Sequence, residues 1–112
     1  MQQIQANAVS AWAEAAADQR PVILDVREAW EVQQASITPP PGVEFVHIAM
    51  GTVPLRLSEL DPARAIACLC HHGGRSMQVA MFLENNGFGH IANISGGIDA
   101  WSQLVDAAVP RY

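Results

Sequence analysis

The chain has 112 residues, of which half are hydrophobic and 15% are charged. Six basic residues against eleven acidic ones give a net charge of -5, which disfavours nucleic acid and anionic membranes as partners because both bind by charge neutralisation of phosphates. Length and composition predict one compact domain over residues 1–112, and they exclude a disordered chain.

The two cysteines, Cys68 and Cys70, lie two residues apart in an apolar run. On one strand their Cα atoms would be about 6.5–7 Å apart, at or beyond the usual separation in a disulfide. We therefore expect two free thiols, as in a reducing compartment. The first twenty residues have no basic start and include Glu14 and Asp18, which is typical of neither a signal peptide nor a membrane span. The sequence predicts a cytoplasmic location.

The first half of the chain alternates between helical and extended patterns. Apolar residues recur at helical spacing after Asn7, which we expect to cap that helix. An uncharged, β-branched run follows Pro21 and gives way to charge at Asp25. We predict a helix over 8–18, a buried strand over 22–24, a short helix over 28–34, a strand over 43–48 and short helical turns within 50–60.

The second half continues this alternation around a run without charged or strongly polar side chains, as suits a central strand buried on both faces. We predict a strand over 65–70, a helix from residue 75 to the stop signal at 85–87, a strand over 90–94 and a last helix over 98–105. The fold class is therefore α/β, with a central, mostly parallel β-sheet flanked by helices on both faces and ligands at the carboxyl ends of its strands. The three tryptophans are expected in the core or at its edge: Trp12, Trp30 and Trp101.

Cys70 lies where the predicted central strand ends and a glycine-rich loop leads into a helix. The helix N-terminus and the loop N–H groups favour a thiolate at this place. Gly73 and Gly74 permit positive φ and close approach of a bound group, and Arg75 adds a permanent cation. The sequence therefore predicts a nucleophilic Cys70 in an anion cradle, whereas Cys68 is expected to pack as a small apolar residue.

The run CHHGGRS over 70–76 resembles the active-site loop of the single-domain rhodaneses, which are sulfurtransferases. Cys70 stands in the place of their persulfide-forming cysteine. The run ILDVREAWE over 23–31 resembles the family's early Asp-Val-Arg motif, and GGIDAW over 96–101 resembles its late Gly-Gly-hydrophobic-x-x-Trp motif. The segment over 35–41, with three consecutive prolines, departs from the family's pattern.

This resemblance implies a parallel sheet flanked by helices, no cofactor, no metal, and a ping-pong transfer of sulfur. Cys70 would take a sulfane sulfur from a small anionic donor such as thiosulfate and pass it to cyanide, a thiol or a protein acceptor. The residues implied to bind the donor or the outer sulfur are His71, His72, Gly73, Gly74 and Arg75, and those implied to support the loop are Asp25, Arg27 and Ser76.

The residues themselves leave further interpretations open. Either histidine would, if protonated, attract an anionic donor or assist proton transfer, and each is otherwise a solvated loop residue. The alternative interpretation of Asp25 and Arg27, which follow the predicted strand over 22–24, is an exposed surface ion pair, and such a pair contributes little stability.

Three other functions compete with sulfur transfer. A phosphatase or arsenate reductase also uses a cysteine and an arginine, but four residues separate Cys70 from Arg75 where the phosphatase pattern has five. A zinc or copper site would draw on Cys68, Cys70, His71 and His72, yet Cys68 would have to leave its strand. The third alternative is a non-enzymatic sulfur carrier that delivers its persulfide only to a protein partner.

Overall fold

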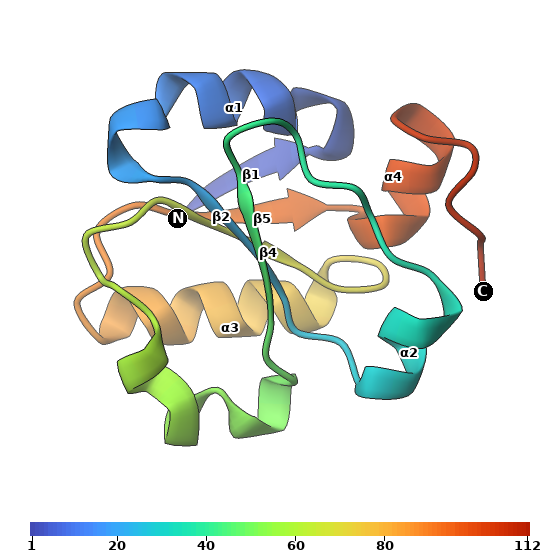
Figure 1. The fold of residues 1–112 in the computed structure, drawn as a ribbon. Coiled ribbons are helices and arrows are strands. Elements are labelled where there is room, and N and C mark those ends of the chain that lie inside the picture. The colour runs from blue at the N-terminus through green and yellow to red at the C-terminus, as the bar shows by residue number, and fades with distance from the viewer.

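The computed structural model describes residues 1–112 and has a five-stranded sheet at its centre (Figure 1). All neighbouring strands pair in parallel, in the order β1-β5-β4-β2-β3. The strands are β1 (Gln2–Gln5), β2 (Val22–Asp25), β3 (Glu44–His47), β4 (Ile66–Leu69) and β5 (Ile91–Ser95). The predicted α/β class is confirmed, and the sheet is parallel throughout.

Helices cover both faces of this sheet, with α1 and α4 on one side and α3 on the other (Figure 1). The α-helices are α1 (Val9–Ala15), α2 (Ala29–Gln34), α3 (Gly74–Asn85) and α4 (Gly97–Leu104). The 3-10 helices are η1 (Ala6–Ala8), η2 (Ala17–Gln19), η3 (Met50–Thr52) and η4 (Pro54–Glu59). None of these helices has the length and apolar character that crossing a membrane requires.

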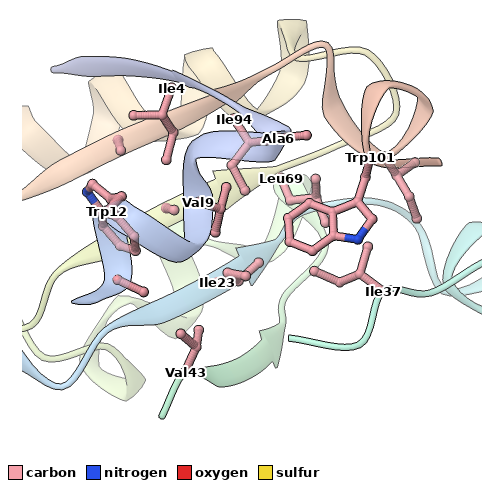
Figure 2. Packing of buried hydrophobic residues seen from close by; sticks show 14 of the residues in the cluster. Ile4, Ala6, Val9, Trp12, Ile23, Ile37, Val43, Leu69, Ile94 and Trp101 are labelled. Atoms are coloured by element: carbon pink, nitrogen blue, oxygen red, sulfur yellow. The ribbon is translucent and has the colours of Figure 1, made fainter. Parts of the chain in front are cut away.

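Two hydrophobic clusters form because side chains alternate along the strands. On β2, Ile23 packs toward α1 and α4, while Leu24 packs toward α3. Figure 2 shows the first cluster, to which Trp12 and Trp101 belong as predicted. Trp30 is 61% exposed, so its predicted place in or beside the core is wrong. The buried residue of the short helix α2 is Glu31, and the neighbouring Trp30 consequently faces solvent.

The amino-terminal segment differs most from the prediction. Strand β1 was not predicted, because an edge strand with Ile4 as its single buried residue produces no alternating pattern. The predicted helix over 8–18 is α-helical only from Val9 to Ala15 and is flanked by 3-10 turns. Ala8 occupies the N-cap position without a side-chain hydrogen bond, so the predicted cap at Asn7 is wrong. Every other predicted strand and helix occurs, with ends that differ from the prediction by at most one residue.

The parallel arrangement brings the carboxyl ends of all strands to one edge of the sheet. Strand β4 lies between β5 and β2, so the loop that follows it at Cys70 has Ser95 on one side and Asp25 on the other. The residues singled out by the sequence therefore meet at this edge.

Candidate active site

The loop after β4 begins at Cys70 and turns into α3 at Gly73. Gly73 has φ +109°, a left-handed conformation that side chains rarely adopt, and a Cβ placed there would lie 3.2 Å from the amide nitrogen of Gly96. Gly74 is the first helical residue and has open space around its Cα. The predicted positive φ is thus needed at Gly73 and not at Gly74.

The amino-terminal turn of α4 holds the two carbonyl groups that start this loop. The amide of Ile98 donates to Cys70 O at 2.9 Å, and the amide of Asp99 donates to His71 O at 3.1 Å. Gly97 makes the approach possible, because a Cβ at this residue would lie 2.4 Å from both carbonyl oxygens. Its φ of +60° also favours glycine.

Because the loop carbonyls point to α4, the following trans peptide groups direct their N–H bonds the other way. The amide of Gly73 donates to Cys70 Sγ at 3.0 Å. Five further amides of the loop and the first turn of α3 donate to no protein acceptor: those of residues 71, 72, 74, 75 and 76. Unpartnered N–H groups at a helix N-terminus stabilise negative charge, so the loop has the features of the predicted anion cradle.

Two buried polar side chains, those of Ser76 and Asn93, form a series of hydrogen bonds that ends at the Cys70 sulfur. Ser76 Oγ lies 3.3 Å from Cys70 Sγ and 2.5 Å from Asn93 Oδ1. The Asn93 amide group donates to Gly73 O at 3.1 Å and to Gln3 Oε1 at 3.0 Å. Ser76 therefore contacts both the sulfur and a neighbouring strand. Asn93 was not predicted as a site residue, although it is the one polar side chain among residues 91–94 of β5.

The two cysteines differ in their surroundings, although both are free and buried. Cys68 is inside β4, and burial raises the pKa of its thiol to about 12. Cys70 is the one with a backbone N–H and a hydroxyl at its sulfur. Cys68 thus packs as expected. His, Cys, Asp and Glu side chains do not gather in groups of three or more that would hold a metal ion, so the proposed ligands of the alternative metal site are not brought together.

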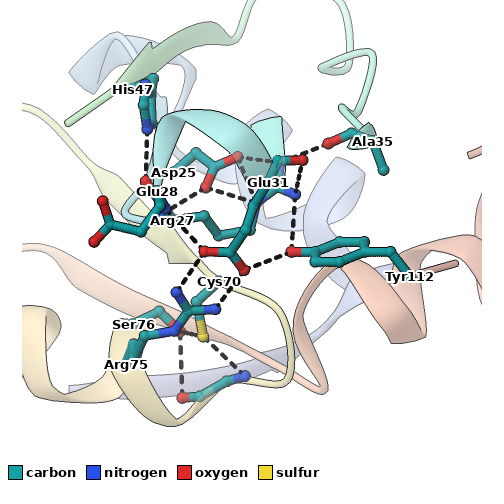
Figure 3. Close-up of polar contacts among 11 residues, drawn as sticks. Asp25, Arg27, Glu28, Glu31, Ala35, His47, Cys70, Arg75, Ser76 and Tyr112 are labelled. Carbon is teal, nitrogen blue, oxygen red and sulfur yellow. Dashed lines mark hydrogen bonds and ion pairs between the residues drawn. The ribbon is translucent and has the colours of Figure 1, made fainter. Parts of the chain in front are cut away.

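Asp25 and Arg27 form an ion pair at 2.7 Å in which both side chains are fully buried. The surface ion pair considered as an alternative is therefore wrong. The Arg27 guanidinium also donates to Ala35 O at 2.8 Å, to Glu31 O at 3.2 Å and to the Tyr112 hydroxyl at 3.1 Å (Figure 3). One arginine thus joins the end of β2 to α2 and to the carboxyl-terminal segment.

Arg75 is paired with a carboxylate that the sequence analysis did not single out. Its guanidinium donates two hydrogen bonds to Glu31, at 2.7 and 2.8 Å, and Glu31 is almost completely buried (Figure 3). Glu31 also accepts from the amide of Glu28 at 2.9 Å and from the Tyr112 hydroxyl at 2.8 Å. These contacts, with those from Arg75 the strongest, lower the pKa of Glu31 to about 2. The positive charge of Arg75 is therefore compensated within the protein.

The Glu31–Arg75 pair leads to a pH-dependent prediction. Because the pKa of Glu31 is about 2 in the folded chain against an ordinary 4.5, its ionised form stabilises the fold above pH 4.5, and this contribution is lost as the pH falls toward 2. Glu31→Gln should lower the free energy of unfolding at pH 7 by about 2–3 kcal/mol. Urea unfolding of both proteins should show that difference shrinking below about pH 4.5. A difference that is constant from pH 7 to pH 3 would contradict the pair's contribution.

The two loop histidines take part in an aromatic stack. The ring centroids of His71 and His72 are 4.0 Å apart with planes at 24°, and those of His71 and Tyr112 are 4.0 Å apart with planes at 8°. Burial lowers the pKa of His71, and His72 adds to this effect. The predicted substrate-binding residues from His71 to Arg75 are thus close together, and within this segment the amide of Gly73 is the group that donates to the sulfur.

Two surface cavities occur elsewhere in the molecule, with volumes of about 220 and 340 Å³. The smaller lies between η3, η4 and α3, and the larger lies between α1, α4 and the proline-rich segment. Neither is lined by a residue of the Cys70 loop. The site is therefore a backbone cradle at the edge of the sheet and not an enclosed pocket.

Known proteins are similar to this chain in sequence and in fold. Residues 9–104 match the profile of the rhodanese-like domain. The chain is 42% identical over 92 residues to the rhodanese-like/PpiC domain-containing protein 12, chloroplastic, of Arabidopsis thaliana, covering 80% of this chain but only 30% of that protein. It is 32% identical over 82 residues to a sulfurtransferase of Allochromatium vinosum, covering 73% and 72%. The crystal structure of a rhodanese-related protein from Thermoplasma volcanium matches 100% of both chains with a TM-score of 0.78 and 25% identity.

Proposed function

Because this chain belongs to the rhodanese-like sulfurtransferase family, we propose that it moves a sulfane sulfur from a donor such as thiosulfate to a nucleophilic acceptor through a persulfide on Cys70. The observation that carries this proposal is the position of the Cys70 sulfur at the start of a loop whose backbone amides are free to hold negative charge. One amide donates to Cys70 Sγ at 3.0 Å and five more have no protein acceptor. A loop of this kind suits a sulfur that bears negative charge both before and after it takes up a second sulfur.

The first half-reaction is a displacement at sulfur. The Cys70 thiolate attacks the outer sulfur of thiosulfate, a new S–S bond forms, and the S–S bond of the donor breaks, with its electron pair leaving on sulfite. The product is a persulfide anion whose outer sulfur lies over the loop amides. In the second half-reaction the acceptor, cyanide for example, attacks that outer sulfur, and the electron pair of the S–S bond returns to Cys70 as thiolate.

The remaining site residues have supporting parts in this proposal. Because Glu31 compensates the charge of Arg75, we assign Arg75 to holding the loop in place more than to binding the donor directly. Ser76 Oγ lies 3.3 Å from Cys70 Sγ and donates its one proton to Asn93 Oδ1 at 2.5 Å, so Ser76 supports the loop beside the sulfur. Asp25 and Arg27 hold α2, which carries Glu31, against the loop.

Initial-rate kinetics with thiosulfate and cyanide test the proposal. Double-reciprocal plots should give parallel lines, as expected for two half-reactions joined by a covalent enzyme form, with one thiocyanate formed per sulfite released. Cys70→Ser should be inactive and Cys68→Ser active. Converging lines, or a Cys70→Ser variant as active as the wild type, would contradict it.

A sulfur carrier that hands its persulfide only to a protein is the second candidate. The observation in its favour is that neither cavity borders the loop, so nothing around Cys70 encloses a small acceptor. The same assay separates the two functions. A carrier would release one equivalent of sulfite per Cys70 and then stop in cyanide, whereas an enzyme would turn over repeatedly.

A further inference from the structure

Tyr112, for which no role was predicted, contacts residues at both ends of the Cys70 loop. It stacks on His71 at the start of the loop and donates to Glu31, the partner of Arg75 at its end. Its ring lies flat on the imidazole of His71, which is the neighbour of Cys70 and the middle member of the three-ring stack with His72. The carbonyl of His71 is fixed at the same time by α4. The ring of Tyr112 therefore covers the side chain of a loop residue whose backbone is already held.

The hydroxyl group of Tyr112 contacts the residues that hold the far end of the loop, at Arg75. It donates to Glu31 Oε1 at 2.8 Å and accepts from Arg27 Nη1 at 3.1 Å (Figure 3). Glu31 in turn receives both hydrogen bonds of Arg75, in the first turn of α3. A single side chain thus joins the start of the loop, at His71, to its end, at Arg75.

We propose that Tyr112 is a positioning residue for the Cys70 loop, whose ring holds the His71 imidazole in its stack and whose hydroxyl holds the Glu31 carboxylate against Arg75. Its effect on sulfur transfer rests on the function proposed above, but its effect on His71 does not. A loop held at both ends keeps the amides of the cradle in place around the sulfur, and misplacement of reacting groups by about 1 Å is enough to slow an enzyme severely.

The titration of His71 gives an independent measure of the stack. The charged or titratable groups that face this imidazole are His72, Glu31, Asp99, Arg75 and Tyr112. The two carboxylates raise the pKa of His71, but burial, His72 and Arg75 lower it, and the net effect is a lowered pKa. Because the ring of Tyr112 provides part of that burial, its removal should bring the pKa of His71 back toward its ordinary 6.5.

Two substitutions separate the ring from the hydroxyl. Tyr112→Phe keeps the stack and loses the hydrogen bonds to Glu31 and Arg27, whereas Tyr112→Leu loses both. Trp30→Leu is the matched control, since Trp30 is exposed and touches Tyr112 only edge-on, with ring centroids 6.1 Å apart and planes at 79°.

The His71 imidazole is followed by proton NMR against pH, and the rate of sulfur uptake from thiosulfate is followed by intact mass. We expect the pKa of His71 to rise in Tyr112→Leu and to stay unchanged in Tyr112→Phe and Trp30→Leu. Sulfur uptake should slow about three- to tenfold in Tyr112→Leu, about two- to threefold in Tyr112→Phe, and not at all in Trp30→Leu.

An unchanged titration of His71 in Tyr112→Leu, or wild-type uptake rates in both Tyr112 variants, would overturn the proposal. Should Tyr112→Leu fail to fold, a wild-type rate in Tyr112→Phe would still overturn the part assigned to the hydroxyl. If the wild-type protein itself takes up no sulfur, the proposed function fails while the NMR titration still decides whether Tyr112 holds His71.

Discussion

Replacing Arg27 by methionine is expected to lower the free energy of unfolding by about 3–5 kcal/mol. The reason is that Asp25, which is completely buried, would lose its charged partner and every hydrogen bond from the guanidinium. The carbonyls of Glu31 and Ala35 would lose a donor as well. A surface ion pair would contribute less than about 1 kcal/mol, so the size of the effect separates a buried pair from an exposed one.

Urea unfolding at pH 7 measures this loss, and a double-mutant cycle assigns it to the pair. Arg27→Met combined with Asp25→Leu removes both charges, so the double variant should be at least about 2 kcal/mol less destabilised than the sum of the two single variants. Arg56→Met serves as the control, because the Arg56–Glu59 pair is exposed, and it should leave stability almost unchanged. Additive effects of the two buried substitutions would contradict the account.

Gly97→Ala is expected to reduce the rate of sulfur transfer about 100-fold. A Cβ at residue 97 would lie 2.4 Å from the carbonyl oxygens of Cys70 and His71, and these are backbone atoms that cannot rotate away as a side chain does. The loop would have to move from α4, breaking the hydrogen bonds from Ile98 and Asp99 and tilting the amides that surround the sulfur. The change acts through the backbone and alters no other side chain chemically.

Gly42→Ala is the matched control for this substitution. Gly42 also has a positive φ, +81°, but a Cβ there would meet nothing within 4 Å. Both variants should lose about 1–2 kcal/mol of stability from the left-handed backbone conformation, and Gly97→Ala should lose more because two hydrogen bonds to the loop also break. Only Gly97→Ala should lose the rate of sulfur transfer. Steady-state kinetics and urea unfolding of the two variants check this. Equal rates would show that contact with the loop carbonyls does not set the geometry of the cradle.

Local patterns predicted the parts of the fold in which neighbours in sequence are neighbours in space. The apolar strands β2 and β4, the turn at Gly73 and the start of α3 follow from runs of a few residues. Strand β1 does not, since its pairing with β5 joins the two ends of the chain and only Ile4 of its residues is buried. Trp30 was misplaced because helical spacing alone does not say which side of a six-residue helix faces the protein.

The residues of the site also divide into those that local sequence predicts and those that it does not. Cys70, the glycines and Ser76 stand together in the chain, and their chemistry is readable from their order. Glu31, Asn93 and Tyr112 act through contacts with residues far away in sequence: Arg75, Ser76 and His71. A glutamate in a short helix and a tyrosine outside regular secondary structure carry no local signal of such a contact, so Glu31 and Tyr112 were found only in three dimensions. Asn93 does stand out as a polar residue in an apolar strand, but its partner Ser76 is not evident from the sequence.

The measurement that tests the central claim most directly is the intact mass of the reduced protein after incubation with thiosulfate, run beside Cys70→Ser and Cys68→Ser, with sulfite assayed in the same samples. The account predicts the gain of one sulfur atom and the release of one sulfite by the wild type and by Cys68→Ser, and neither by Cys70→Ser. Sulfur gained by Cys70→Ser, or no sulfur gained and no sulfite released by the wild type, would contradict the assignment of Cys70 as the nucleophile that accepts sulfur from thiosulfate.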